Sequence, residues 1–395
     1  MSPHRALGDV SDLLEDRSRH IEFNGHLTNH VKHAVIALAA IGAPEARVRE
    51  YHREYSTLTP YGFPLEPARP SDRVITGDNW RDHLGRRRHF SAYQDFFEVE
   101  VAEKGIDTAV GEYAPELLRG WIGAFTHAAI HLGWAVWARH PGMAAEALAY
   151  LAFSYVRVID ETDQTPATAD AADPVASVTL LARLWDDDAR FRARVDDVIA
   201  DVNAFGELHP ELSRSGLQAR VAGVAGAGLT ELTDRPRWLT DADLPTIRGR
   251  VRRAATLLYL ASPGDFVVLH LITALFALER VADVVDSATA VDVYNLYWAG
   301  ARIILAAEAK VPTASKLQEL DAVFTDVAED ATNGAEDFEL TARRAWLEDE
   351  EHNPKLVFVL RSWWDDRPLS LYRHAAAQFT QTPDLPATFE EPPND

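Results

Sequence analysis

The sequence predicts an all-α protein, a large and mostly helical domain built from two helical halves with long loops. Apolar residues recur every three or four positions in several long stretches, and this period is typical of helices that bury one face. Alanine is abundant, whereas the alternating apolar and polar runs that indicate strands are scarce. We therefore expect helices to supply most of the core.

Four stretches show the helical period most clearly, and they are residues 30–43 (HVKHAVIALAAIGA), 143–156 (MAAEALAYLAFSYV), 196–205 (DDVIADVNAF) and 251–261 (VRRAATLLYLA). Pro60–Asn79 is rich in proline and glycine and predicts a loop. Asp160–Asp173 is polar and low in complexity, which predicts a linker. We expect a single domain over residues 1–395, with an N-terminal half of about 1–160 and a C-terminal half of about 174–395.

Composition excludes several classes of function. The net charge of −22 disfavours binding to nucleic acids and to anionic membranes, because both need basic surfaces. The absence of cysteine excludes disulfides, zinc–thiolate sites, iron–sulfur clusters and thiol nucleophiles. Any metal ion must therefore be held by histidine, aspartate, glutamate or a modified side chain.

Two features bear on the location of the protein. The first 20 residues are polar and charged, without the apolar region of a signal peptide, so we expect a cytoplasmic protein. Gly120–Ala138 is uncharged when its histidines are neutral, and its length approaches the roughly 20 residues that span a bilayer. It contains two histidines, a threonine and several glycines. We predict a buried core helix there and no membrane contact.

Most of the 15 histidines fall into two groups. Seven lie in polar or loop-like surroundings, and we predict surface positions for nearly all of them: His4, His20, His52, His83, His89, His140 and His209. Others lie in apolar stretches, where a spacing of three or four residues places side chains on one helix face: His26 with His30, His30 with His33, and His127 with His131. His270 is the only titratable residue between Asp265 and Glu279.

Two interpretations of these apolar histidines remain open. Each could be a hydrogen-bonded core residue, since a buried imidazole needs a partner. Together, in a chain without cysteine, they also fit a nitrogen-rich metal site, because imidazole binds iron, copper, zinc and nickel.

A lysine near the C-terminus raises a separate question. In "EEHNPKLVFV", we expect Asn353 to cap a helix and Pro354 to take its first position, which places Lys355 in the first turn. A cation is unfavourable at that end of a helix. The simplest explanation is a surface lysine that faces the acidic cluster Glu348–Glu351.

Five motifs, taken in order, resemble the questin oxidase-like family from about Phe23 to Arg361. They are GHLTNHVKHAVIALAAIGA, THAAIHLGWAV, AAEALAYLAFSY, LHLITALFALERV and EHNPKL. The family includes questin oxidase, which opens an anthraquinone ring, and metal-dependent ring-cleaving dioxygenases. The resemblance implies a non-haem Fe(II) centre, between the two halves, held by four histidines and a carboxylated lysine. The matching residues are His30, His127, His270, His352 and Lys355.

The resemblance also implies supporting roles around that centre. Asn29 is expected to orient a ligand as a neighbour of His30. His131 and His26 are the candidates for proton handling, although His26, His33 and His131 match only some branches of the family. Pro354 departs from the family pattern.

We expect a metal-dependent oxygenase that oxidises or cleaves a ring of an aromatic polyketide with dioxygen. A planar substrate needs an apolar pocket, and the candidate lining residues are Trp121, Phe125, Trp134, Trp137, Phe153, Tyr155, Tyr61 and Phe63. The sequence does not predict the oligomeric state.

Three alternatives are kept. One is an NADPH-dependent Baeyer–Villiger-type monooxygenase, against which the glycine cluster Ala222–Leu232 lacks the dinucleotide-binding order and follows no clear strand. The second is a non-catalytic helical scaffold. The third is a hydrolytic zinc site, for which four histidines and an anion leave too few open positions.

Overall fold

Helices form most of the described chain and strands almost none of it, as predicted. The computed structural model describes residues 6–71, 73–159, 171–201 and 216–383. The predicted linker lies mostly outside these ranges, as do His4, His209 and most of the C-terminal tail. Within them the only sheet has two short antiparallel strands, β1 (Glu22–Phe23) and β2 (Leu27–Thr28).

The elements before the predicted linker are η1 (Gly8–Glu15), α2 (Val31–Ala40), α3 (Glu45–Thr57), η2 (Trp80–His83), η3 (Arg87–His89), α4 (Phe90–Lys104), α5 (Ile106–Leu117), η4 (Leu118–Gly120), η5 (Gly123–Thr126), α6 (His127–Ala138) and α7 (Pro141–Phe153). Pro60–Asn79 contains no helix among its described residues, as predicted. The predicted core helix Gly120–Ala138 begins only at His127, because the backbone turns left-handed just before it.

The elements after the predicted linker are α8 (Pro174–Asp187), α9 (Ala189–Ala200), α11 (Leu217–Gly226), α12 (Thr230–Thr233), α13 (Trp238–Asp241), α14 (Leu244–Ala261), α15 (Phe266–Ala282), α16 (Ser287–Ala307), α17 (Ala314–Val323), α18 (Ala331–Leu347), α19 (His352–Asp366) and α20 (Ser370–Ala376). Aspartate caps start many of these helices: Asp173, Asp188, Asp243, Asp265 and Asp286 each accept a backbone N–H from the first turn.

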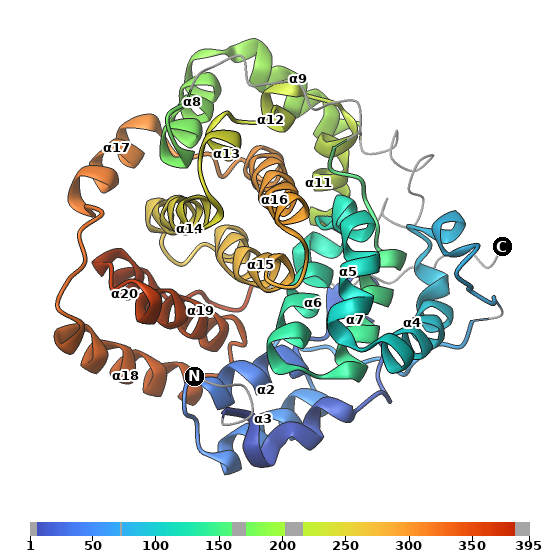
Figure 1. Cartoon of the computed structure of the whole chain (residues 1–395). Helices are drawn as coiled ribbons and strands as arrows, with labels where there is room; N and C mark the ends of the chain where they lie inside the picture. Colours follow the sequence, from blue (N-terminus) through green and yellow to red (C-terminus); the bar gives the residue numbers. More distant parts are fainter. Residues whose placement is uncertain (1–5, 72, 160–170, 202–215, 384–395) are drawn as a thin grey trace.

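The two parts of the chain pack on each other through central helices. Figure 1 shows α2–α7 on one side and α14–α20 on the other, with α6 beside α15 and α2 beside α19. His127 contacts His270, and Gly133 contacts Ala277 further along, so α6 and α15 run in the same direction. This pairing brings residues from before and after the predicted linker into one core.

Gly133 sets how closely α6 and α15 approach. A Cβ atom at this position would lie 2.2 Å from the Cα atom of Ala277. Real Cβ atoms do not come so near to backbone, so only glycine allows the observed spacing.

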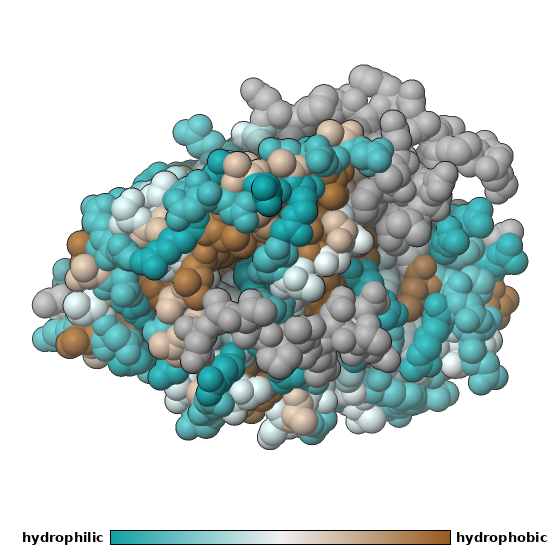
Figure 2. All heavy atoms as spheres, turned by 90° about the horizontal axis from the view of Figure 1, so that it is seen from above, coloured by the Kyte–Doolittle hydropathy of each residue, from teal (hydrophilic) through white to brown (hydrophobic). Residues whose placement is uncertain are grey.

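The described surface is mostly hydrophilic in the view of Figure 2. Polar and charged residues cover most of the described face in Figure 2, and hydrophobic residues show between them. None of the described helices combines the length and the apolar content needed to cross a bilayer.

The contact between α6 and α15 gives the first prediction. Gly133→Ala should lower the free energy of unfolding by about 3 kcal/mol, because the added methyl overpacks a backbone contact. Gly249→Ala is the matched control, since a Cβ on this α14 glycine meets nothing within 4 Å. This substitution should raise the free energy of unfolding by up to about 1 kcal/mol, because alanine favours a helix over glycine. Urea unfolding of the three proteins checks both signs. Equal stability of Gly133→Ala and the parent would contradict the close approach.

Candidate metal centre

The structure brings the five residues implied by the resemblance into one buried cluster. His30 is the N-cap of α2, His127 is the first residue of α6, His270 lies in the second turn of α15, and His352 and Lys355 lie in the first turn of α19. The four imidazoles form a closed ring in which neighbouring centroids are 4.7–4.9 Å apart, in the order His30, His127, His270, His352.

The hydrogen bonds of two of these imidazoles fix their tautomers. Nδ1 of His127 lies 2.7 Å from the carbonyl oxygen of Ala124, and Nδ1 of His270 lies 2.7 Å from that of Phe266. A carbonyl oxygen only accepts, so each Nδ1 carries the proton and each Nε2 carries a lone pair. Burial lowers the pKa of His127 to about 3 and that of His270 well below its usual value, which keeps both rings neutral.

Two lone pairs therefore face each other. The Nε2 atoms of His127 and His270 are 3.0 Å apart, and neither has a proton to place between them. Two imidazole nitrogens at the usual distance of about 2.1 Å from one ion, at a right angle, would be about 3 Å apart. The observed separation fits two adjacent ligands of a single cation.

A third imidazole points an unpaired nitrogen into the same space. Nδ1 of His352 is hydrogen-bonded to Oε1 of Glu350 at 2.5 Å. The other ring nitrogen of His352, Nε2, is buried and has no hydrogen-bond partner among the described residues. One potential ligand atom each from His30, His127 and His352 lie within 4.8 Å of one another. A buried imidazole nitrogen without a partner is costly, and a metal ion would satisfy it.

Lys355 is part of this cluster and not a surface residue. Its exposed fraction is 2%, and its Nζ lies 2.8 Å from Nδ1 of His30. Among the described residues no carboxylate is within ion-pair distance of it. Burial lowers the pKa of the Lys355 amine, although the charges of Glu351 and Glu350 act in the opposite direction. The alternative of a surface lysine was therefore wrong.

Sequence reasoning missed two carboxylates. Glu350 and Glu351 were assigned to an acidic surface cluster, but both are buried. Oε1 of Glu351 lies 3.3 Å from Nδ1 of His30 and accepts a hydrogen bond from the Tyr61 hydroxyl at 2.9 Å. The available signal was their position directly before His352, at the positive end of a helix.

The helix with Lys355 begins earlier than expected. Glu351, not Asn353, is the N-cap of α19, and His352 is its first residue. Asn353 instead binds the backbone of Thr380 through both of its side-chain atoms. Pro354 falls within the first turn, where a backbone N–H has no partner inside the helix, so it does not interrupt α19.

A strained segment leads into His127. Ala124, Phe125 and Thr126 have φ angles of 50°, 48° and 70°, which cost about 1–2 kcal/mol each for residues other than glycine. Gly123 packs against the carbonyl of Ser154 so closely that a Cβ would lie 1.8 Å from its oxygen. The result is a carbonyl, that of Ala124, directed at Nδ1 of His127.

Three aromatic side chains border the cluster. The rings of Phe125 and Phe266 lie 5.1 Å and 4.7 Å from that of His270, and Tyr61 contacts Glu351. Phe266 was not predicted. The other predicted aromatics contact different residues; for example, Trp121 stacks on Tyr297 and Phe153 stacks on Tyr150.

A second buried polar cluster lies beside the ring of imidazoles. Nε2 of His33 is 2.7 Å from Nδ1 of His131, whose Nε2 is 3.2 Å from Glu146, and Glu146 pairs with Lys32 at 2.5 Å. The His33 ring lies 5.7 Å from that of His30. His33 therefore lies between His131 and the ring of imidazoles, and its own Nδ1 has no hydrogen-bond partner among the described residues.

Asn29 and His26 have other surroundings. The side-chain oxygen of Asn29 accepts the N–H of Val31 and so fixes the start of α2, next to His30. His26 lies on the turn between β1 and β2, so its expected pairing with His30 on one helix was wrong. Its carbonyl accepts a hydrogen bond from Gln218.

Two of the histidines expected on the surface are buried. His89 is enclosed at the start of α4, and His140 caps α7 and pairs with Glu15 at 3.0 Å. Their polar sequence neighbours hid the long-range packing of the helices that they start.

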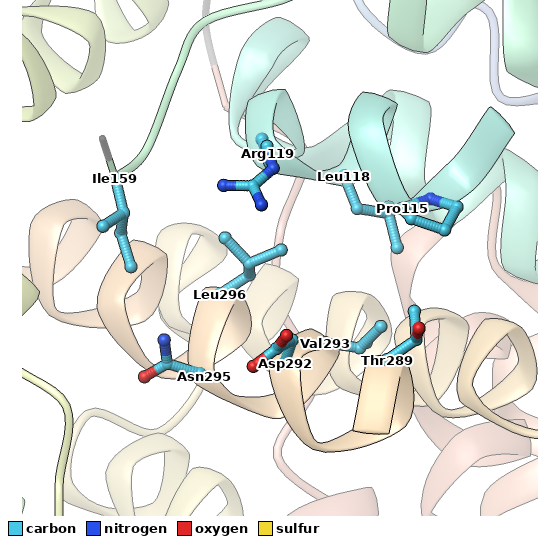
Figure 3. Close-up of a pocket in the computed structure, with 9 residues that line it drawn as sticks. All are labelled: Pro115, Leu118, Arg119, Ile159, Thr289, Asp292, Val293, Asn295 and Leu296. Atoms are coloured by element: carbon cyan, nitrogen blue, oxygen red, sulfur yellow. The ribbon is translucent and has the colours of Figure 1, made fainter. Parts of the chain in front are cut away.

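Two cavities lie away from the ring of imidazoles. Figure 3 shows one of about 250 Å³ between α5, η4 and α16, with Arg119, Asp292 and Asn295 among its lining residues. The other, of about 470 Å³, is a surface hollow bordered by Glu350 and Thr382. The glycine cluster Ala222–Leu232 runs from the end of α11 into α12, and the described residues before it contain no strand directly ahead of α11.

Comparison with known proteins identifies the family of the chain. The questin oxidase-like family model matches residues 27–360. The oxidoreductase AflY of Aspergillus parasiticus is 29% identical over 159 residues, covering 37% of this chain and 31% of that protein. The Baeyer–Villiger oxidase GME11358 of Pestalotiopsis microspora is 30% identical over 162 residues, covering 38% and 35%.

The questin oxidase of Aspergillus terreus matches over a longer region. It is 24% identical over 269 residues, covering 65% of this chain and 57% of that protein. The chain thus spans between about a third and somewhat over half of the length of these relatives. Their names agree with the prediction of an oxidoreductase.

The buried histidines predict how stability depends on pH. Below about pH 6.5 a histidine is protonated in the unfolded chain but stays neutral when it is buried in the folded chain. Each such histidine therefore lowers the free energy of unfolding by up to about 1.4 kcal/mol for each pH unit of acidification. Burial lowers the pKa of ten described histidines: His20, His26, His30, His33, His52, His127, His131, His140, His270 and His352. Burial raises the pKa of Glu22 to about 7 and also raises that of Glu351. These two carboxyls bind protons more readily in the folded chain, so acidification through this range increases the free energy of unfolding that they contribute.

These histidines outnumber these two carboxyls, so the free energy of unfolding of the metal-free protein should fall by several kcal/mol between pH 7 and pH 5.5. Thermal unfolding across this range, repeated at high salt to remove general charge repulsion, measures the effect. A flat profile would contradict the neutral buried imidazoles.

Proposed function

The chain belongs to the questin oxidase-like family, and on that premise we propose that it is a non-haem iron-dependent oxygenase. It oxidises or cleaves a ring of an aromatic polyketide of the anthraquinone type with dioxygen. The observation that carries this proposal is the pair of unprotonated Nε2 atoms of His127 and His270, 3.0 Å apart. The unpartnered Nε2 of His352 supports it.

The ligands in this proposal are His30, His127, His270, His352 and Lys355. Four neutral imidazoles suit Fe(II) and other late divalent metals. A bound iron(II) ion would supply the activation of dioxygen. The protein holds the ligands rigidly, because each imidazole is buried and is fixed by a neighbour.

Lys355 contributes as a carbamate. Its neutral amine would attack carbon dioxide, so that a nitrogen–carbon bond forms while one carbon–oxygen π bond breaks and its electron pair moves to that oxygen. One nitrogen-bound proton would pass to water, which leaves a carbamate anion with oxygen donors. The surroundings favour this product, because an anion suits both the first turn of α19 and a cation held by the imidazoles. An unmodified ammonium at the same place lies 2.8 Å from Nδ1 of His30 and has no carboxylate of the described residues within ion-pair distance, although the charges of Glu351 and Glu350 favour it from further away.

The surrounding side chains orient the substrate and handle protons. Phe125 and Phe266 present apolar ring surface beside His270, where a planar substrate could lie next to the centre. We assign proton handling to His131, which bonds to His33 beside the centre and to Glu146, the partner of Lys32. His26 is on the hairpin turn, and the geometry gives it no such connection.

A Baeyer–Villiger-type monooxygenase that uses NADPH is the second candidate. The name of GME11358, a Baeyer–Villiger oxidase, favours it. Against it, the described residues contain no parallel sheet, which is the usual support of a dinucleotide site.

The role of Lys355 is tested by substitution. Lys355→Arg keeps a cation but cannot form a carbamate, and it should lower the iron content at least tenfold, as should Lys355→Ala. Lys355→Glu restores an anion and should recover part of the iron. Elemental analysis after loading with Fe(II) measures all three, and ¹³C NMR of the parent with labelled bicarbonate detects the carbamate. Full iron content in Lys355→Arg would refute this role.

The need for iron separates the two candidates. We expect oxygen consumption with a hydroxyanthraquinone to require Fe(II), to be lost with a chelator, and to proceed without NADPH. An oxygen electrode and absorbance at 340 nm measure both consumptions, and His270→Ala serves as the metal-deficient control. NADPH oxidation matched to product in chelated enzyme would establish the monooxygenase instead. Zinc in place of iron, with hydrolysis, would overturn both candidates.

A further inference from the structure

We propose that Glu350 is a positioning residue for the metal centre and that Thr382, in the C-terminal segment, holds it in place. This inference rests on the proposed function, since it concerns how a metal ligand is held. It adds a residue outside the ligand set and gives the segment after α20 a role in metal binding.

Glu350 holds His352 at two points. Its Oε1 accepts the backbone N–H of His352 at 3.0 Å and bonds to Nδ1 of the same residue at 2.5 Å. The first bond satisfies an N–H at the start of α19, and the second places the imidazole proton on Nδ1. Nε2 is therefore the lone-pair nitrogen, and the ring cannot rotate without breaking a short charge-assisted bond.

This carboxylate does not compete with the ligands, although it lies near them. Oε1 of Glu350 is occupied by His352, and Oε2 accepts a hydrogen bond from the Thr382 hydroxyl. Both oxygens thus already have partners, which are Nδ1 of His352, on the other side of that imidazole from Nε2, and the Thr382 hydroxyl. An ionised carboxylate bonded to the far nitrogen of a ligating histidine raises the basicity of the ligating nitrogen.

The C-terminal segment Gln378–Thr382 is itself anchored. Asn353 binds the carbonyl and the N–H of Thr380 at 3.2 Å and 3.0 Å, and the carbonyl of Gln378 accepts the Tyr259 hydroxyl. These bonds place Thr382 over Glu350, at the edge of the surface hollow. The chain of contacts runs from this segment through Glu350 to Nε2 of His352.

Substitutions of Glu350 and of Thr382, which bonds to it, test the inference. Glu350→Gln keeps a side chain of the same shape but removes the charge, and it should raise the dissociation constant for Zn(II) roughly 10- to 100-fold. Thr382→Val should raise it by less, in the same direction, and Thr382→Ser should restore the parent value. Competition with a chromogenic chelator measures each constant.

A redox measurement separates positioning from general damage. With iron bound, Glu350→Gln should move the Fe(III)/Fe(II) midpoint potential to a more positive value, because the lost charge favoured the ferric state. Asp349→Asn is the matched control. It borders the same hollow and loses the same charge, but its side chain pairs with Arg47 and not with an imidazole. It should change neither the dissociation constant nor the potential.

The outcomes are distinguishable. If the parent binds no metal, the proposed function fails and this inference falls with it. If the parent binds Zn(II) but Glu350→Gln binds it within twofold of the parent, or Asp349→Asn weakens binding equally, only the role of Glu350 is overturned. If Glu350→Gln does not fold by circular dichroism, Thr382→Val decides, and an unchanged constant and potential in that variant would overturn the proposal.

Discussion

The close approach of α6 and α15 is the constraint on which the centre depends. Gly133 lies directly against the backbone of Ala277, and one to two turns away the same two helices place His127 opposite His270. A wider spacing would separate the two Nε2 atoms and let solvent or a proton between them. Because the helices are in contact, the two imidazoles are buried and neutral, and their Nε2 lone pairs lie 3.0 Å apart, as two ligands of one cation would.

Two neighbouring acidic residues at the start of α19, Glu350 and Glu351, contact different imidazoles of the ring. Glu350 faces away from the ring of imidazoles and fixes one of them, whereas Glu351 lies against His30 and Tyr61. The same helix end also carries Lys355, which is unfavourable there as a cation and favourable as an anion. The proposed carbamate would therefore replace an unfavourable charge at this helix terminus by a favourable one.

The sequence predicted the features that depend on local pattern or on ordered motifs. Helical periodicity located α2, α7 and α14, and the order of the motifs selected the residues that the fold brings together. The hairpin near His26 had a signal that was overlooked. Asn24 and Gly25 have φ angles of 48° and 80°, as in the turn that an Asn–Gly pair favours. The left-handed residues before α6 had no such signal, because alanine, phenylalanine and threonine avoid that conformation and only tertiary contacts impose it. The burial of Glu350 and Glu351 likewise depends on helices distant in sequence.

The distance along the chain between His30 and Lys355 has a consequence for folding. Their side chains are 2.8 Å apart, yet 325 positions separate them in sequence. Closing such a long loop is slow, and during synthesis the first histidine leaves the ribosome long before the helix that carries the lysine. A nascent chain can therefore hold only part of the ligand set, and the complete centre becomes available only once α19 has docked. Metal uptake would then be among the last events of folding. An ion bound there would link α2, near the start of the chain, to α19, near its end.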